Sequence, residues 1–177
     1  MVDWEAVAKE HGPLVWRTVY RLLGSRCGDV GDCFQETFLS ALDASRRQVV
    51  RNWPGLLQRI ATARALDVLR RRKRDTIVRQ NEVELEQAFT RDRDPSAGMQ
   101  QAELQEQLRE ALTQLPPAQS DVFCLRHLND MSYEEIASEM QMSVDNVGVT
   151  LHRAKARLRE LLTQENSPMK VKGANHV

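Results

Sequence analysis

The stretch that decides the fold is residues 115–162, which read LPPAQSDVFCLRHLNDMSYEEIASEMQMSVDNVGVTLHRAKARLRELL. The two prolines at 116–117 end one helix and preset the backbone of the next, which is predicted over 118–128. Ser132 with Glu135 three residues later is a capping-box arrangement, so a short helix is expected over 133–140.

A last helix follows the short turn, and Ser143 is positioned to cap it. Its apolar residues recur every three or four positions, which indicates one continuous buried stripe. These residues are Val144, Val147, Leu151, Ala154, Leu158 and Leu161.

A short helix, a tight turn and a longer helix form the layout that places the second helix in a DNA major groove. The outward positions of the last helix carry cations and polar groups, namely Asn146, Thr150, His152, Arg153, Lys155, Arg157 and Arg159. A solvated amphipathic helix of a bundle is the simpler alternative. Because the capped turn coincides with the cations, the pattern favours DNA binding.

Composition indicates an all-α protein of one or two small soluble domains. The 177 residues include only eight Gly and six Pro, with no alternating β-branched stretch and no long apolar run. Three cysteines, Cys27, Cys33 and Cys124, form no C-x-x-C pair, and the four histidines are scattered. We therefore expect a cytoplasmic protein that is not inserted in a membrane, with no metal site, no cofactor and no catalytic residues.

The net charge of zero hides a strong segregation of charge along the chain. Residues 46–79 hold eleven Arg and Lys against two Asp, a surplus of nine. Residues 80–110 hold eight acids against three Arg, and residues 111–151 hold six acids against Arg126 alone. The basic segment therefore predicts a local surface for a polyanion despite the neutral total.

The first half of the chain predicts three helices. The first should restart at Pro13 and end at Gly24, and the second should be capped by Asp29. A basic loop is expected over 44–53, followed by a cationic helix over 55–74.

Domain boundaries follow from where the helical periodicity is lost. We predict two small helical domains, a three- to four-helix bundle over 1–75 and a helix-turn-helix domain over 99–164. A flexible linker over 76–98 would join them, and a disordered tail would occupy 165–177.

Three segments, in order, resemble the extracytoplasmic-function group of bacterial sigma factors, the smallest members of the sigma-seventy family. Residues 29–39, DVGDCFQETFL, resemble the pattern D-x-E-D-x-x-Q-E-x-F-L, and residues 59–71, RIATARALDVLRR, resemble R-I-A-x-N-x-A-x-D-x-x-R-R. The third segment is the proline-started helix-turn-helix, with LPPAQ at 115–119, SYEEIA at 132–137 and LHRA at 151–154. The resemblance covers most of residues 5–74 and 100–162.

The resemblance implies a factor that binds core RNA polymerase and directs promoter recognition, under the control of an anti-sigma factor. By motif, Asp32, Gln35 and Glu36 would bind the clamp-helix coiled coil of the large polymerase subunit. The loop and basic helix would hold the single-stranded minus-ten element. The residues implied there are Arg46, Arg47, Arg51, Asn52, Arg59, Arg64, Arg70 and Arg71.

The same resemblance assigns the minus-thirty-five element, as duplex, to the last helix. The residues implied are Ser143, Asp145, Asn146, Val149, Arg153, Lys155 and Arg157, with the phosphates taken by Lys155 and Arg157. Because the family favours cations where Gly148 and Thr150 stand, we expect this domain alone to bind duplex weakly.

Two other classes of protein remain open at this stage. A stand-alone helix-turn-helix regulator would bind duplex DNA as a dimer, but it needs a dimer seam or an effector pocket. An enzyme acting on DNA would need clustered acids for a metal or a placed nucleophile. Asp29 and Asp32 are better explained by helix capping.

Overall fold

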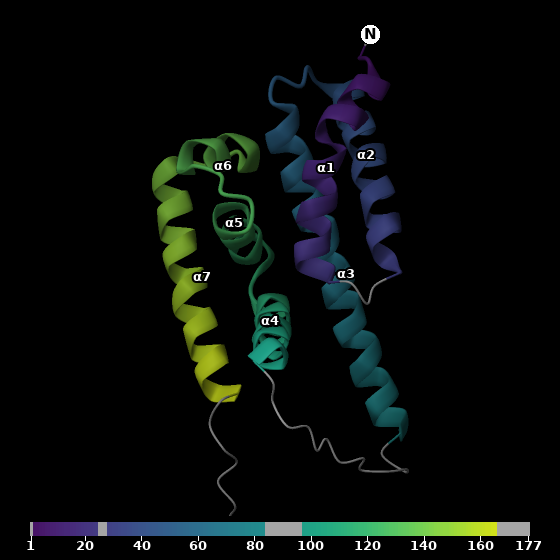
Figure 1. Ribbon diagram of the computed structural model, residues 1–177. Coiled ribbons are helices and arrows are strands. Elements are labelled where there is room, and N and C mark those ends of the chain that lie inside the picture. The colour runs from purple at the N-terminus through teal and green to yellow at the C-terminus, as the bar shows by residue number, and fades with distance from the viewer. Residues whose placement is uncertain (1, 25–27, 84–96, 166–177) are drawn as a thin grey trace, which may run out of the picture.

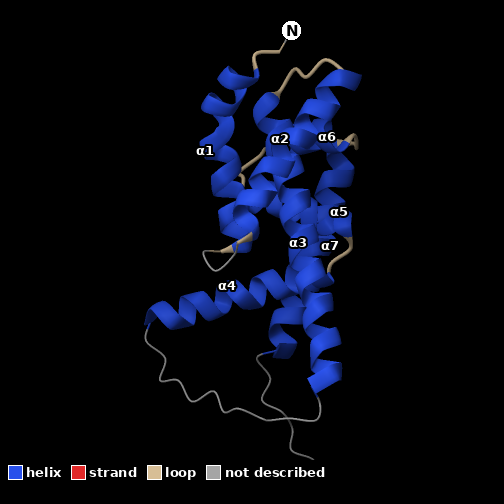
Figure 2. Cartoon of the chain, turned by 90° about the vertical axis from the view of Figure 1, so that its right-hand side faces the viewer, coloured by secondary structure: helices blue, strands red, loops and turns tan. Residues whose placement is uncertain are grey.

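The computed structural model describes residues 2–24, 28–83 and 97–165, which form seven α-helices and no strand within those ranges. Two groups of helices lie side by side (Figure 1), and α4 lies across the others when the molecule is turned (Figure 2). The predicted all-α class is confirmed. The helices are α1 (Trp4–Leu23), α2 (Asp29–Arg47), α3 (Trp53–Val83), α4 (Ala97–Gln114), α5 (Pro117–His127), α6 (Tyr133–Met140) and α7 (Val144–Glu165).

The helix-turn-helix forms as its caps predict. The Ser132 hydroxyl accepts from the Glu135 N–H, and the Glu135 carboxylate accepts from the Ser132 N–H, at 3.1 and 2.7 Å. Gln141 ends α6 in the left-handed conformation, with φ 54°. The Ser143 hydroxyl then accepts from the Asn146 N–H at 3.2 Å and caps α7.

Two predicted helix starts were wrong. Helix α1 continues through Pro13 without restarting, and Pro13 lies on the exposed side of the helix. Gly28, and not Asp29, precedes α2, and no side chain caps this end. Asp29 instead pairs with Arg72 of α3, with 2.6 Å between the carboxylate and Nη2.

The basic loop and the linker are shorter than the sequence suggested. Helix α2 runs to Arg47, so only residues 48–52 connect it to α3. Helix α3 continues to Val83, through the first part of the expected linker, because no Gly or Pro interrupts 75–83. The rest of the linker, over 84–96, and the expected tail beyond Glu165 lie outside the described residues.

The main core is shared by both halves of the chain. It joins buried residues of α1, α2 and α3 to buried residues of α4, α5 and α7 in a single cluster. A smaller second cluster, with Val122, Leu125, Ile136, Val147 and Leu151, holds the helix-turn-helix together. The two halves are therefore packed against each other, and α3 lies between them.

The turn between α5 and α6 is inserted between α1 and α3. The Asn129 amide oxygen accepts from the Thr18 hydroxyl at 2.9 Å, and its amide nitrogen donates to the Thr62 hydroxyl at 3.0 Å. The Asn129 carbonyl accepts from Gln58 at 3.4 Å, and the Leu128 carbonyl accepts from Arg21. This inserted turn, residues 128–130, forms hydrogen bonds between the two halves in addition to their shared apolar core.

We predict that Asn129→Ala lowers the free energy of unfolding by about 1 to 3 kcal/mol, because it removes the side-chain hydrogen bonds to the buried Thr18 and Thr62 hydroxyls. Urea unfolding followed by circular dichroism measures this. Asn146→Ala, at an exposed position of α7, is the matched control and should change little. Equal stabilities of the two variants would contradict a structural role for Asn129.

Candidate nucleic-acid and polymerase interface

One face of α2 is an acidic surface that the core does not use. Asp32, Gln35 and Glu36 are all exposed on this face, as expected from the sequence. Leu39, one turn further along, is 62% exposed, so an apolar side chain lies among polar ones. A central apolar residue with a polar rim is the composition of a protein-binding surface.

The connection between α2 and α3 carries cations that face solvent. Arg46 and Arg47 lie in the last turn of α2, and Arg51 lies in the loop before α3. Arg46 pairs with Asp43 at 3.5 Å, whereas Arg47 and Arg51 have no ion pair among the described residues. Arg71, on the exposed side of α3, likewise has none within the described part of the chain.

Arg64 links the acidic face to the cationic helix. Its guanidinium lies 3.8 Å from the Glu36 carboxylate and donates to the Ser40 hydroxyl at 3.0 Å. The exposed ion pair contributes little to stability. Its position nevertheless places the two predicted binding surfaces next to each other on α2 and α3.

Two cations that the sequence placed at a DNA surface lie against the second half, where Arg70 is largely covered and Arg59 stays 36% exposed. Arg70 is only 17% exposed and donates to Asp67 at 3.0 Å and to the Ser120 hydroxyl of α5 at 2.7 Å. Arg59 faces Glu139 of α6, with 4.0 Å between Nε and the carboxylate. The sequence did not predict this coverage, because it arises from packing between segments far apart along the chain.

The outward face of α7 remains open. Asp145, Asn146, Val149 and Arg153 are exposed along one side of its first three turns, and Lys155 and Arg157 follow, also exposed. Val149 is 49% exposed, so it lies outside the buried apolar stripe of α7. Arg157 pairs with Glu160 at 2.9 Å, whereas Lys155 has no ion pair among the described residues.

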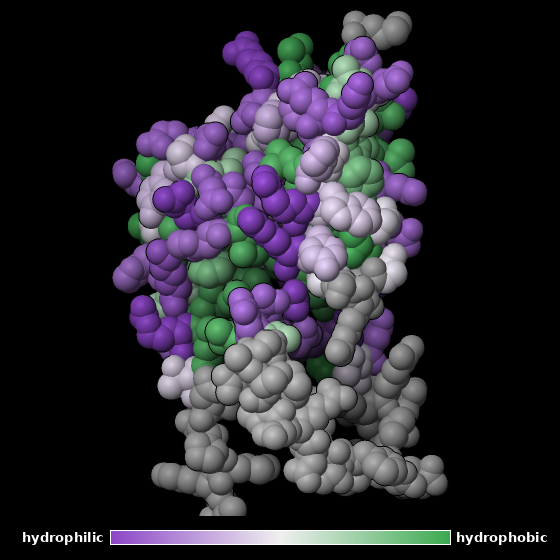
Figure 3. All heavy atoms as spheres, in the orientation of Figure 1, coloured by the Kyte–Doolittle hydropathy of each residue, from purple (hydrophilic) through white to green (hydrophobic). Residues whose placement is uncertain are grey.

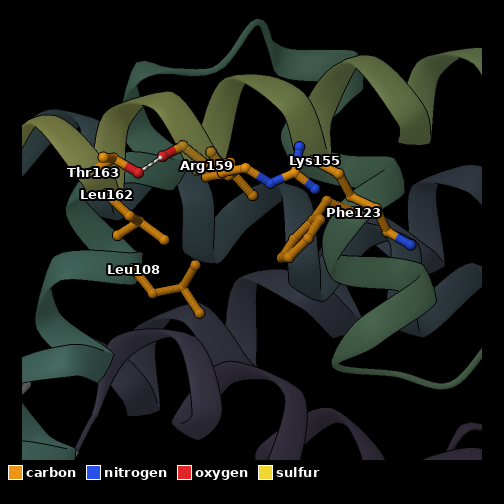
Figure 4. A pocket seen from close by; sticks show the side chains of 7 residues that line it. Leu108, Phe123, Lys155, Arg159, Leu162 and Thr163 are labelled. Carbon is orange, nitrogen blue, oxygen red and sulfur yellow. Dashed lines mark hydrogen bonds between the residues drawn. The ribbon is translucent and has the colours of Figure 1, made fainter.

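A groove of about 470 Å³ lies between α4, α5 and α7. Leu108, Phe123, Leu158 and Leu162 form its apolar lining, and Lys155 and Arg159 lie at its border (Figure 4). Hydrophobic side chains gather in a hollow between α7 and α4 on a largely hydrophilic face (Figure 3). Its lining holds no acid, His or Cys.

Cys33 and Cys124 have the character of core residues. Burial raises the pKa of the Cys33 thiol to about 11 and raises that of Cys124 further, so neither is a thiolate near neutral pH. Across the described residues, no group of His, Cys, Asp and Glu is arranged to hold a metal ion. None of the helices in the same ranges has the length and apolar character of a membrane span.

Asp121 is a strongly perturbed carboxyl group beside Arg70. Loss of water by burial raises its pKa to about 6, although nearby Arg70 opposes the shift. One of its carboxylate oxygens is buried without a hydrogen-bond partner. The ionised form of Asp121 therefore destabilises the packed arrangement.

Comparisons with known proteins match both halves of the chain to one family. The family model described as Sigma-70 region 2 matches residues 7–75, and the one described as Sigma-70, region 4 matches residues 105–158. The chain is 29% identical to the ECF RNA polymerase sigma factor SigE of Mycolicibacterium smegmatis over 167 residues, 94% of this chain and 64% of that protein. It is 51% identical over 55 residues to the RNA polymerase sigma-E factor of Streptomyces antibioticus, 31% of each chain. The chain thus spans less than two thirds of these relatives.

Two solved structures share the fold. One is the sigma factor RpoE in complex with the anti-sigma factor NepR from Bartonella quintana, with a TM-score of 0.53 and 21% identity. It covers 91% of this chain and 97% of that one. The other is CnrH in complex with the cytosolic domain of CnrY, with a TM-score of 0.56 and 23% identity, covering 93% and 89%.

We predict that Asp121 makes stability depend on pH. Because its pKa is raised in the folded protein, its stabilising contribution is complete below the unfolded pKa and is lost as the pH rises to about 6. Between pH 4 and 7, the free energy of unfolding should fall by about 2 to 3 kcal/mol more in the wild type than in Asp121→Asn. Urea titrations at both pH values measure this, and parallel pH dependences in the two proteins would refute it.

Proposed function

We propose that this chain, which belongs to the extracytoplasmic-function group of the sigma-70 family, binds core RNA polymerase and directs it to promoters to initiate transcription. The observation that carries the proposal is the coexistence of three surfaces in one chain. These are the acidic face of α2, the cations around the start and outer side of α3, and the open face of α7. A stand-alone regulator needs only the last of these.

Polymerase binding is assigned to α2. Asp32, Gln35 and Glu36 would contact basic groups on the clamp-helix coiled coil of the large polymerase subunit, with Leu39 as the apolar centre. Electrostatic complementarity of this kind fixes the orientation of the partner and speeds its association. The protein would supply binding energy only, with no catalytic chemistry of its own, and would act in the cytoplasm.

Promoter binding is assigned to two separate elements. The exposed cations of the α2–α3 connection and of α3 would hold the phosphates of an opened minus-ten strand. The start of α7 would enter the major groove of the minus-thirty-five element, with Asn146, Val149 and Arg153 reaching base edges. Lys155 and Arg157 would contact phosphates, which fix the register.

Control by an anti-sigma factor is consistent with the packed arrangement. Arg59 and Arg70 are engaged by α6 and α5, so a partner that holds the halves together would keep these cations from DNA. One of the two solved structures named above, that of RpoE, contains an anti-sigma factor as the partner. Polymerase would have to favour a separated arrangement in order to release them.

The decisive test of the function is transcription in vitro with core polymerase on a pool of genomic fragments. Promoter-specific transcripts that require the added chain are the expected result, and their start sites would reveal the promoter. Tight binding to palindromic duplex DNA without polymerase, and no transcripts, would favour the dimeric regulator instead.

We predict that Asp32→Lys weakens binding to core polymerase at least about tenfold, because a cation would replace an acid of the docking face. Glu5→Lys, the same charge change at an exposed position of α1, is the matched control. Affinity is measured by fluorescence anisotropy with labelled protein. Equal affinities for the two variants would exclude α2 as the polymerase-binding element.

We predict that Arg47→Glu combined with Arg71→Glu abolishes promoter-dependent transcription while core binding stays within about twofold, since both residues are exposed and lie outside the acidic face of α2. The control is Lys9→Glu with Arg17→Glu on α1, which makes the same change in net charge. Transcription and core binding are measured on the same preparations. Parallel loss of both activities would count against the DNA-binding role of these cations.

A further inference from the structure

Each half of the chain has packing contacts of its own besides the core that the two halves share. The smaller apolar cluster lies entirely within the second half. Helices α1, α2 and α3 of the first half likewise pack on one another. The two family matches, over 7–75 and 105–158, divide the chain at the same place. Separation of the halves would therefore break the interface between them and leave the helices of each half packed.

Arg70 of α3 makes its polar contact with α5 through Ser120 and not through the neighbouring Asp121. Its Nη2 donates to the Ser120 hydroxyl at 2.7 Å, and its Nη1 donates to Asp67 of α3 at 3.0 Å. The Ser120 hydroxyl in turn donates to the Pro117 carbonyl at 2.9 Å. Both terminal nitrogens of Arg70 therefore have acceptors, and neither acceptor is Asp121.

Asp121 is consequently an acid that lies at this interface with one oxygen unpaired. Its Oδ1 is buried and accepts no hydrogen bond within the described part of the chain. The largest charge effects on the group come from Arg70, Asp67 and Arg59, all on α3, so the carboxyl group faces that helix. Arg59 lies against Glu139 of α6, with 4.0 Å between Nε and the carboxylate. Two cations thus act on Asp121 from nearby, but each contacts another acid.

Ionised Asp121 costs free energy in the packed arrangement that it does not cost when the halves are apart. Loss of water by burial raises its pKa to about 6, and Asp67 adds to the shift while Arg70 and Arg59 oppose it. In separated halves the carboxylate regains water, and an ordinary pKa of about 4 is expected. A group with a higher pKa in the packed state favours packing when protonated and opposes it when ionised. At neutral pH Asp121 is ionised and therefore opposes packing.

We propose that Asp121 keeps the two halves of this protein separable, so that a measurable fraction of the molecules has separated but folded halves at neutral pH. In those molecules Arg70 loses Ser120 as an acceptor and becomes more exposed. The inference adds a means of regulation to the proposed function and rests on it for any consequence in transcription. The separation itself is measured without polymerase or DNA.

The experiment uses the full chain with two dyes, attached through unnatural residues at the exposed positions Glu5 of α1 and Glu134 of α6. Single-molecule energy transfer counts packed and separated molecules at dilutions at which two chains do not associate. At pH 7.5, Asp121→Asn should lower the ratio of separated to packed molecules at least about tenfold, because the amide carries no charge that loses water. Asp75→Asn, the same change at an exposed position of α3, is the matched control and should stay within about twofold of the wild type.

The pH dependence of the same ratio is a second readout. Protonation of Asp121 removes its cost in the packed state, so fewer molecules should have separated halves at low pH. Glu139 also faces α3, and loss of water raises its pKa, so it changes the ratio in the same direction in the wild type and in Asp121→Asn. Between pH 7.5 and pH 5, the ratio should therefore fall about tenfold more in the wild type than in Asp121→Asn.

Asp67→Asn tests the same interface and serves if Asp121→Asn fails to fold. The Asp67 side chain is 60% exposed and competes with Asp121 for Arg70. Its replacement leaves Nη1 of Arg70 available to the Asp121 carboxylate, so the ratio of separated to packed molecules should fall about threefold. An unchanged ratio would contradict the competition for Arg70 on which the inference depends.

Three further results would overturn the inference. They are the absence of separated wild-type molecules at pH 7.5, equal ratios for Asp121→Asn and Asp75→Asn, and equal pH dependences of the wild type and Asp121→Asn. The proposed function has a separate test in each case, because transcription with core polymerase is measured on unlabelled wild-type protein. Absence of transcription would refute the function and leave the measured separation standing.

Discussion

The packing of α3 on two sides is the constraint on which the rest of the structure depends. Leu57, Ala61 and Leu66 are fully buried, and the polar Gln58 and Thr62 are buried as well. A helix that buries both apolar and polar positions needs a partner on each side. Helices α1 and α2 supply one partner, and the turn between α5 and α6 supplies the other through Asn129.

The polar contacts between α3 and the second half of the chain fix how the two surfaces fit together, but each contributes little free energy. Each hydrogen bond to Asn129 contributes about 0.5 to 1.5 kcal/mol, and the partly exposed pair of Lys73 with Glu110, at 3.3 Å, contributes less than about 1 kcal/mol. Asp121 opposes the packing whenever it is ionised. The arrangement is therefore held by a defined set of contacts that a tightly binding partner has enough free energy to replace.

Local features of the structure could be predicted from the sequence because their causes lie within a few residues. Ser132 with Glu135, Ser143 and the prolines at 116–117 specify helix ends by their own hydrogen bonds or ring geometry, and those ends form as expected. The exposed cations on α7 followed from helical periodicity in the same way. The start of α2 was misplaced because Asp29 has two possible partners, the helix end and a guanidinium 43 residues away.

The positions of Arg59 and Arg70 could not be predicted, since their partners come from α6 and α5. A surplus of nine cations over 46–79 predicts a basic surface, but it does not reveal which cations the acidic second half will cover. The whole chain has 25 cations and 25 acids, so the basic segment has enough acids elsewhere in the sequence to pair with once the chain folds. Glu139 gave no signal of its own in the sequence, as it stands in an acidic helix beside two other glutamates.

The same charge division would give the chain two electrostatic states if its halves separated. With the halves packed, acids such as Glu139 and Glu110 lie against the cations of α3, so the field presented to a distant polyanion is reduced. With the halves apart, Arg59 and Arg70 would lose their contacts with α6 and α5 and become more exposed. Affinity for nucleic acid would then depend on the distance between the halves, so any partner that prefers one arrangement would change DNA binding without touching the DNA site.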